Sequence, residues 1–77
     1  MWHEQDNSLV KEFNFPDFKT ALAFTVKIGE LAEAANHHPD VTLSWGKVQV
    51  KLTTHDVGEV TEKDKQLAAK IDQIKLQ

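Results

Sequence analysis

The stretch that decides the fold is residues 41–53, Val-Thr-Leu-Ser-Trp-Gly-Lys-Val-Gln-Val-Lys-Leu-Thr. Apolar and polar side chains alternate on both sides of Gly46-Lys47, as in two strands that each bury one face. Glycine in the first position of a two-residue loop favours a type II′ turn and therefore a β-hairpin. The predicted register pairs Trp45 with Val48, Leu43 with Val50 and Val41 with Leu52.

Histidines stand at the open end of this hairpin. Asn36-His37-His38-Pro39 precedes its first strand, and Thr54-His55 follows its second. Continuing the predicted register places Pro39 opposite Thr54 and His38 opposite His55. Directly paired residues have Cβ atoms ~4.5–5.5 Å apart, so we expect three of the four histidines to gather at one end of the sheet.

Upstream of the histidines the sequence predicts two strands. Residues 1–4 form a short strand, and residues 9–15 form a longer one in which phenylalanines stand at period two. The turn formers Asp6-Asn7-Ser8 lie between them.

A helix follows, with Asp17 as its N-cap. Apolar residues recur at three- and four-residue spacing, so one face of this helix is expected to be buried, Phe18 and Leu22 included. Gly29 costs about 1 kcal/mol in mid-helix against alanine, which suggests close approach of another element. Pro39 prevents the helix from continuing.

The last helix begins after Thr61, an N-cap with Asp64 at the third helical position, which forms a weak capping box. The predicted fold class is α+β, with the order β-β-α-β-β-α. The simplest packing is a four-stranded antiparallel sheet with the helices on one face. At 77 residues the chain has room for a single domain, residues 1–77.

Composition excludes several classes of function. The net charge is −3 and all nine basic residues are lysines, scattered along the chain, which argues against nucleic acid as a partner. No cysteine is present, so disulfide and thiolate chemistry are excluded and the cytoplasm is the expected compartment. No apolar run approaches the ~20 residues that span a bilayer. Because one small core gives marginal stability, self-association is expected.

Clustered imidazoles suit proton transfer. Histidine titrates near pH 6.5, so His37, His38 and His55 can supply both a general acid and a general base at neutral pH. His3 stands apart and is interpreted as an ordinary surface residue. No serine stands in a nucleophile context, so covalent catalysis is not expected.

Other interpretations of the same residues stay open. Zinc could use one residue of the histidine pair with His55 and a carboxylate from Asp40 or Asp56, but no HxH or HxxxH pattern exists and no metal is expected. Trp45 is either core or an aromatic wall for a flat ligand. Glu33, one turn before the histidine pair, could orient an imidazole or be a solvated helix acid.

At these residues the chain resembles the pterin-4a-carbinolamine dehydratases. The resemblance is carried by Asn36-His37-His38-Pro39, the aromatic Trp45, Lys47 to Leu52, Thr53-Thr54-His55 and the Thr61 to Ala68 segment. It covers nearly the whole chain, and the combination of His-His-Pro with Thr-His is its specific part. Members of the family usually carry a further N-terminal segment before a tryptophan like Trp2.

The resemblance implies dehydration of 4a-hydroxytetrahydropterin to quinonoid dihydropterin, a hydro-lyase reaction of tetrahydropterin recycling, without metal or cofactor. It implies acid/base roles for His37 and His55, and a role for His38 mainly in holding substrate. We further predict that Trp45, Thr54, Glu33 and Pro39 contribute to substrate binding. A homodimer or homotetramer is the expected assembly. The alternative is a non-catalytic protein-binding module of coactivator or dimerisation type on the same scaffold.

Overall fold

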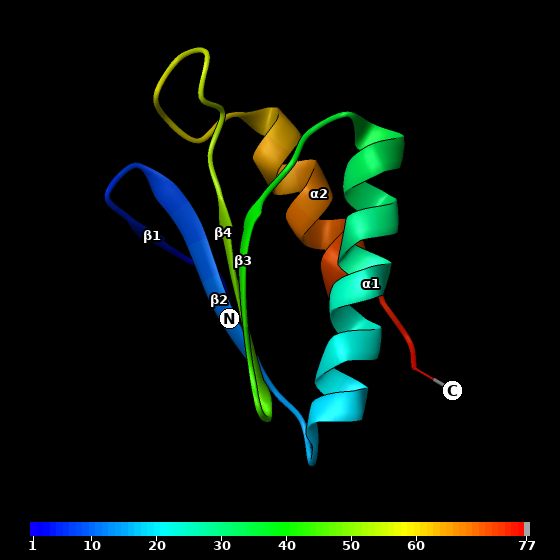
Figure 1. The fold of residues 1–77 in the computed structure, drawn as a ribbon. Coiled ribbons are helices and arrows are strands. Elements are labelled where there is room, and N and C mark those ends of the chain that lie inside the picture. Colours follow the sequence, from blue (N-terminus) through cyan, green and yellow to red (C-terminus); the bar gives the residue numbers. More distant parts are fainter. Residues whose placement is uncertain (77) are drawn as a thin grey trace.

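A computed structural model describes residues 1–76 of the chain (Figure 1). The elements follow the predicted order β-β-α-β-β-α. They are β1 (His3–Gln5), β2 (Ser8–Asn14), α1 (Phe18–Ala35), β3 (Asp40–Ser44), β4 (Lys47–Leu52) and α2 (Glu62–Asp72).

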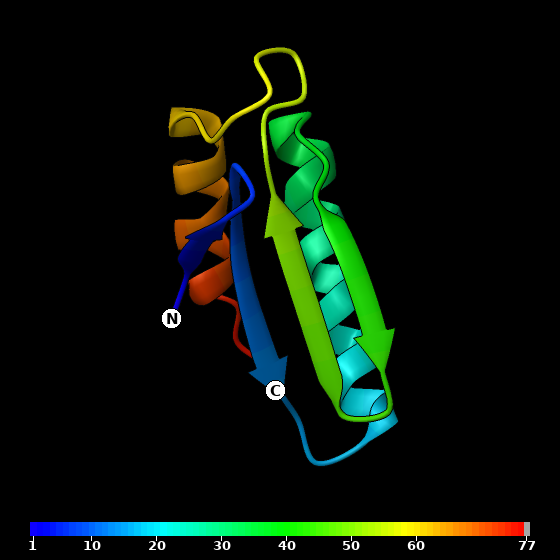
Figure 2. The same cartoon turned by 90° about the vertical axis from the view of Figure 1, so that its left-hand side faces the viewer.

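The four strands form one antiparallel sheet in the order β1-β2-β4-β3. Both helices lie on the same face of this sheet, and α1 lies behind β4 and β3 while α2 lies on the side of β1 and β2 (Figure 2). The predicted α+β class and packing are therefore confirmed. Neither helix is long and apolar enough to cross a membrane.

The core fills the space between the sheet and the helices. Strand β4 is central, and its alternate side chains point toward the helix layer, where three of them are fully buried. The buried hydrophobic cluster consists of Ala21, Phe24, Ile28, Val48, Val50, Leu52, Leu67, Ala68 and Ile71. At its margin Lys11 Nζ (2.7 Å) and Trp2 Nε1 (2.9 Å) both donate to the Asp72 carboxylate, which ties β2 and the N-terminus to the end of α2.

Local signals at the turns and helix starts are confirmed. Asp6 and Asn7 both have positive φ (51° and 63°), as the two central residues of a type I′ hairpin turn require. The Asp17 side chain accepts a 2.7 Å hydrogen bond from the Thr20 N–H, so it is the N-cap of α1.

The predicted register of the second hairpin is wrong by two residues. Strand β3 ends at Ser44, which pairs with Lys47, so the turn is Trp45-Gly46 instead of Gly46-Lys47. Neither turn residue has positive φ, so this is not the II′ turn that glycine suggested. A shift of two residues keeps every side chain on its predicted face, but it moves Trp45 out of the ladder and leaves it 70% exposed.

Gly46 is required by a neighbouring strand. The Phe15 N–H donates to the Gly46 carbonyl at 2.8 Å, where the chain leaves β2. A Cβ at position 46 would lie 2.7 Å from the Phe15 carbonyl oxygen, closer than side chains approach backbone. Glycine is therefore needed at position 46 because the Phe15 backbone comes too close for a side chain. It is not needed for an unusual backbone dihedral in the turn.

The first helix differs from expectation on one flank. Phe18 and Leu22 were expected in the core, but they are 45% and 43% exposed, and Val26 beside them is 52% exposed. Gly29 is also exposed, and no other part of the described chain comes within 4 Å of a Cβ built there. The apolar arc of α1 is thus wider than the face that its own sheet covers.

We predict that Gly46→Ala destabilises the fold by about 1–3 kcal/mol, because the added methyl group forces the end of β2 away from the hairpin. Urea unfolding measured by circular dichroism gives the free energy of unfolding. Lys47→Ala, one residue along and exposed, is the matched control and should change that energy by less than about 0.5 kcal/mol. Equal effects of the two substitutions would contradict the packing described for Phe15 and Gly46.

Candidate active site

The site begins where α1 ends. Asn36 adopts the left-handed conformation (φ 51°) and its N–H is bonded to carbonyls of the last helical turn. The next N–H, that of His37, donates to the Ala32 carbonyl at 3.1 Å. Asparagine tolerates this conformation better than most residues. The chain is thereby reversed, and the His37 side chain reaches the start of α2.

His37 meets a buried carboxylate there. Its Nε2 lies 2.6 Å from Asp64 Oδ1, and Asp64 is 0% exposed. The other carboxylate oxygen accepts from the Thr54 hydroxyl (2.7 Å) and from the Thr61 N–H (2.9 Å). Because the Thr54 hydrogen is given to Asp64, the Thr61 hydroxyl, 2.6 Å away, donates to Thr54. One carboxylate thus joins the ends of α1 and β4 to the start of α2.

These hydrogen bonds decide the charge of Asp64. Burial by itself raises the pKa of this carboxyl, but the hydrogen bonds from His37, the Thr61 N–H and Thr54 outweigh burial and lower the pKa below its ordinary value of 3.8. Asp64 is therefore ionised at neutral pH and can only accept hydrogen bonds. Nε2 of His37 consequently carries a hydrogen, and Nδ1 is left as the nitrogen that can take up or release a proton.

The second histidine has a different partner. His38 Nε2 lies 2.6 Å from Glu33 Oε2, one turn back on α1. Both side chains are open to solvent, with exposed fractions of 56% for His38 and 79% for Glu33. Glu33 thus contacts His38 and not His37, and an exposed pair of this kind fixes an imidazole only weakly.

The third histidine comes from the turn after β4. His55 is exposed and stands next to Thr54, whose backbone closes the turn through bonds to the N–H groups of Val57 and Gly58 (3.2 and 2.9 Å). The strand pairing of β3 with β4 does not extend beyond Asp40 and Lys51, so His38 and His55 are not the cross-strand pair that was predicted.

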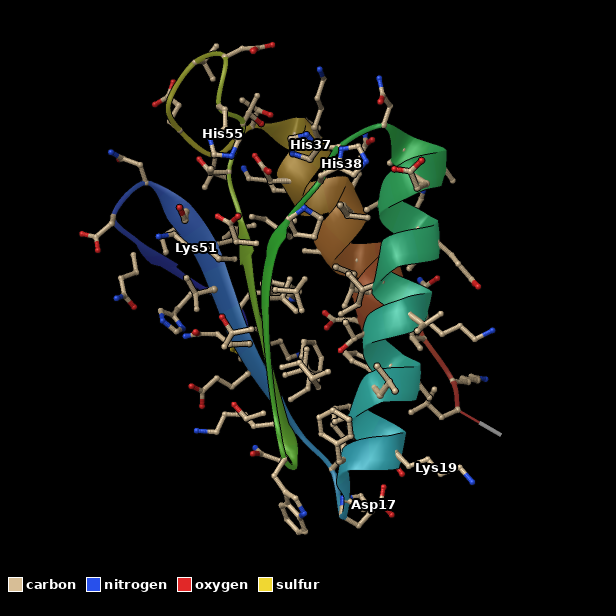
Figure 3. The ribbon with its side chains drawn as sticks, viewed as in Figure 1. Asp17, Lys19, His37, His38, Lys51 and His55 are labelled. Carbon is tan, nitrogen blue, oxygen red and sulfur yellow. The ribbon has the colours of Figure 1, made fainter. Side chains whose placement is uncertain are left out.

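The three histidines nevertheless line one pocket, at the end of the molecule opposite Asp17 (Figure 3). Its volume of about 320 Å³ is at the lower end of the range for small-molecule sites. Its walls come from the α1–β3 connection, the turn after β4 and the start of α2. The lining residues are Asn36, His37, His38, Thr54, His55, Asp56 and Lys63.

Three residues of the predicted site lie elsewhere. Trp45 is at the turn of the β3–β4 hairpin, at the other end of β3 from the histidine pair, so within one chain it does not reach the pocket. Glu33 touches the site only through His38. Pro39 follows the histidine pair and contributes no lining atoms. Within residues 1–76, no three histidine, cysteine or carboxylate side chains form a group that could hold a metal ion.

Asp64 is the residue that sequence reasoning missed. The capping box of α2 accounted fully for an aspartate three residues after Thr61, so nothing required a second role. The contact with His37 joins positions 27 residues apart, which no local pattern reveals. The spacing of Leu67, Ala68 and Ile71 was a signal that could have found it, because the same helical stripe places Asp64 on the buried side of α2.

Comparisons with known proteins identify the family of the chain. The family model "Pterin 4 alpha carbinolamine dehydratase" matches residues 1–74. A protein of Roseiflexus sp. (strain RS-1), provisionally named pterin-4-alpha-carbinolamine dehydratase, is 51% identical over 95% of this chain and 78% of its own length. A protein of Picosynechococcus sp. with the same provisional name is 48% identical over 95% of this chain and 79% of its own length.

Two solved structures share the fold. The transcriptional coactivator/pterin dehydratase from Brucella melitensis superimposes with a TM-score of 0.87 at 34% identity, covering 92% of this chain and 78% of that one. A pterin dehydratase-like protein described as a RuBisCO assembly factor of the α-carboxysome has a TM-score of 0.75 at 22% identity, covering 94% and 83%. By its family model and its relatives, the chain belongs to the pterin-4a-carbinolamine dehydratase family.

Proposed function

We propose that this protein dehydrates 4a-hydroxytetrahydropterin to quinonoid dihydropterin, as a hydro-lyase of tetrahydropterin recycling. The observation that carries the proposal is the pocket in which three imidazoles meet, one of them held by a buried carboxylate. The names of the relatives point to the same substrate class. The expected cytoplasmic location and a homodimeric or homotetrameric assembly belong to the same proposal.

The reaction needs two proton transfers. The hydroxyl on the ring carbon leaves as water once an acid has protonated it, and the adjacent ring nitrogen gives its hydrogen to a base as the carbon–nitrogen double bond forms. Two imidazoles can do both, because each takes up or releases a proton near neutral pH. The chemistry requires neither a metal nor an electron carrier.

The roles of the residues follow from their surroundings. His37 and His55 are the proposed proton-transfer pair, since they approach the pocket from two different segments. Asp64 is a positioning residue that fixes the tautomer of His37 and leaves Nδ1 for the substrate. His38 and Thr54 are proposed to hold the substrate, with Glu33 acting through His38 and Pro39 restricting the backbone beside the pair.

A second candidate is a protein-binding function without catalysis. It is favoured by the exposed apolar flank of α1, and the solved relative at 34% identity is described as a coactivator as well as a dehydratase. A pure binding module has no need of three histidines in one pocket, so we place catalysis first.

We predict that His55→Ala slows enzymatic dehydration by about 10²–10⁴-fold, the usual contribution of one general acid or base. The rate is measured as disappearance of freshly generated 4a-hydroxytetrahydropterin by absorbance. His3→Ala, which removes an exposed histidine from β1, is the matched control and should leave the rate unchanged. A wild-type protein that does not exceed the spontaneous rate would refute the proposed function.

We predict that Asp64→Asn lowers the free energy of unfolding by about 1–3 kcal/mol at neutral pH, because a buried set of hydrogen bonds loses its charged acceptor. It should also flatten the acid dependence of stability. The folded-state pKa of Asp64 lies below the unfolded value, so its contribution is present above pH 3.8 and is lost as the pH falls through the lower, folded-state pKa.

Urea unfolding at a series of pH values measures both effects. Some acid dependence will remain in the variant, because hydrogen bonds from Thr20 also lower the pKa of Asp17. Asp56→Asn, at the exposed rim of the pocket, serves as control. If Asp64→Asn kept the full wild-type slope, the ionised network at His37 would be wrong.

A further inference from the structure

The side chain of Thr54 is held by two hydrogen bonds. Its hydroxyl donates to Asp64 Oδ2 at 2.7 Å and accepts from the Thr61 hydroxyl at 2.6 Å. Thr54 is 7% exposed and Asp64 is fully buried, so water competes little for these groups. Because a hydroxyl has one hydrogen and two lone pairs, one lone pair of Thr54 is left to face the pocket that this residue lines.

The backbone of Thr54 holds the loop that carries His55. Its N–H donates to the Glu59 carbonyl at 3.2 Å, in an isolated β-bridge between the two residues. Its carbonyl accepts from the N–H groups of Val57 and Gly58. These bonds close a loop that projects from the end of the molecule (Figure 1). The position of His55 therefore depends on where Thr54 is held.

Thr61 contacts the same network twice. Its N–H donates to Asp64 Oδ2 at 2.9 Å, and its hydroxyl donates to Thr54. Hydrogen bonds in a chain polarise one another, so the bond from Thr61 makes the Thr54 hydroxyl a stronger donor to Asp64. The direction of this bond also matters. Because Thr61 donates, its oxygen does not compete with Asp64 for the hydrogen of Thr54.

We propose that Thr54 and Thr61 are positioning residues for the dehydration, and that their two hydroxyls, bonded in series to Asp64, hold His37 and the His55 loop in the arrangement that proton transfer needs. The inference rests on the proposed function and extends it. Asp64 keeps His37 in place while its own charge is stabilised, and the two threonines supply part of that stabilisation. In this role they act through Asp64 and through the loop, without contact to the reacting atoms.

Such a link is useful because proton transfer is sensitive to distance. A general acid or base must come within about 2.6–3.2 Å of the atom that gives or takes the proton, and a misplacement of about 1 Å can cost about 10²-fold in rate. His37 is held through Asp64 at the start of α2, whereas His55 stands on an exposed loop (Figure 3). The bonds of Thr54 join these two supports.

Removal of the Thr54 hydroxyl tests the link. Thr54→Val keeps nearly the same shape, and we expect it to lower kcat/KM for 4a-hydroxytetrahydropterin by about tenfold, the effect of losing one hydrogen bond. Thr54→Ser keeps the hydroxyl and should recover most of the activity. The matched control is Thr53→Val, which loses a 2.9 Å hydrogen bond to the Asn7 carbonyl outside the pocket and should leave kcat/KM unchanged. Equal effects of Thr54→Val and Thr53→Val would overturn the proposal.

The donor role of Thr61 can be separated from its role as N-cap. Serine and glycine are both accepted at N-caps, and glycine there is nearly as stable as threonine. Thr61→Gly removes the donor to Thr54 and should lower kcat/KM by about threefold, because it weakens the bond to Asp64 without removing it. Thr61→Ser keeps the donor and should recover that loss. Equal activities of the glycine and serine variants would overturn the role of the Thr61 hydroxyl.

A double variant tests whether the two hydroxyls act in series. The Thr61 side chain reaches Asp64 only through Thr54, so Thr61→Gly should have no further effect on kcat/KM once Thr54→Val has been made. Effects that multiply in the double variant would mean that the two side chains act independently. The series of bonds would then be wrong.

The charge of Asp64 gives a readout that needs no substrate. Burial raises the pKa of this carboxyl, and the hydrogen bonds from His37, the Thr61 N–H and Thr54 together lower it below its ordinary value. Thr54→Val should therefore raise the pKa of Asp64, measured from the pH dependence of its carboxyl ¹³C chemical shift, and Thr61→Gly should raise it less. Loss of a substrate contact alone would leave this titration unchanged. The other titratable groups around the pocket are the same in every variant: Glu33, His38, His55, Asp56 and Lys63.

Amide hydrogen exchange tests the loop. The N–H groups of Val57 and Gly58 donate to the Thr54 carbonyl, so they should exchange faster with solvent in Thr54→Val than in the wild type or in Thr53→Val. Unchanged exchange would show that the Thr54 hydroxyl does not hold the loop, and the link to His55 would be wrong.

These measurements separate the inference from the proposed function. If the wild type does not accelerate dehydration, the proposed function fails, while the titration of Asp64 and the exchange in the loop still test the threonine network. If the wild type is active but Thr54→Val changes neither the titration nor the exchange, the positioning role is wrong and the proposed function stands.

Discussion

The structure depends on the hydrogen bonds that one buried carboxylate, that of Asp64, accepts. An ionised aspartate without access to water must accept hydrogen bonds, because leaving it unpaired costs several kcal/mol. Asp64 is fully buried, and the three groups that donate to it come from the end of α1, the end of β4 and the first turn of α2. The interaction that closes the fold at this end also sets the tautomer of His37. Stability and the proposed chemistry therefore share the same atoms.

Much of the fold follows from local patterns. Alternation gave the faces of β3 and β4 correctly, and the caps at Asp17 and Thr61 mark the true helix starts. Alternation cannot distinguish registers that differ by two residues, because both bury the same side chains. In the observed register Gly46 lies against Phe15, a contact between distant segments that no local pattern shows.

The histidine cluster could be predicted although its register was wrong. His37 and His38 come just before β3, and Thr54 and His55 come just after β4, so both pairs lie at the same end of the sheet. This is true of any antiparallel hairpin formed by the two strands, whatever its register. The partners of the histidines could not be predicted in the same way. Sequence analysis left open whether Glu33 contacts an imidazole at all, and it already had a sufficient role for Asp64 as a capping residue. A residue whose local role is already explained, such as Asp64, can have a second role that the sequence does not reveal.

Phe18 and Leu22 were expected in the core, but both are exposed. The two wrong predictions have the same cause. Periodicity shows that a helix has an apolar face, but not which molecule covers it. On α1 the arc from Phe24 and Ile28 is covered by the chain's own sheet, and the adjacent arc from Phe18 and Leu22 is not. Periodicity alone therefore could not separate the part of the apolar arc of α1 that the sheet covers from the part that stays exposed.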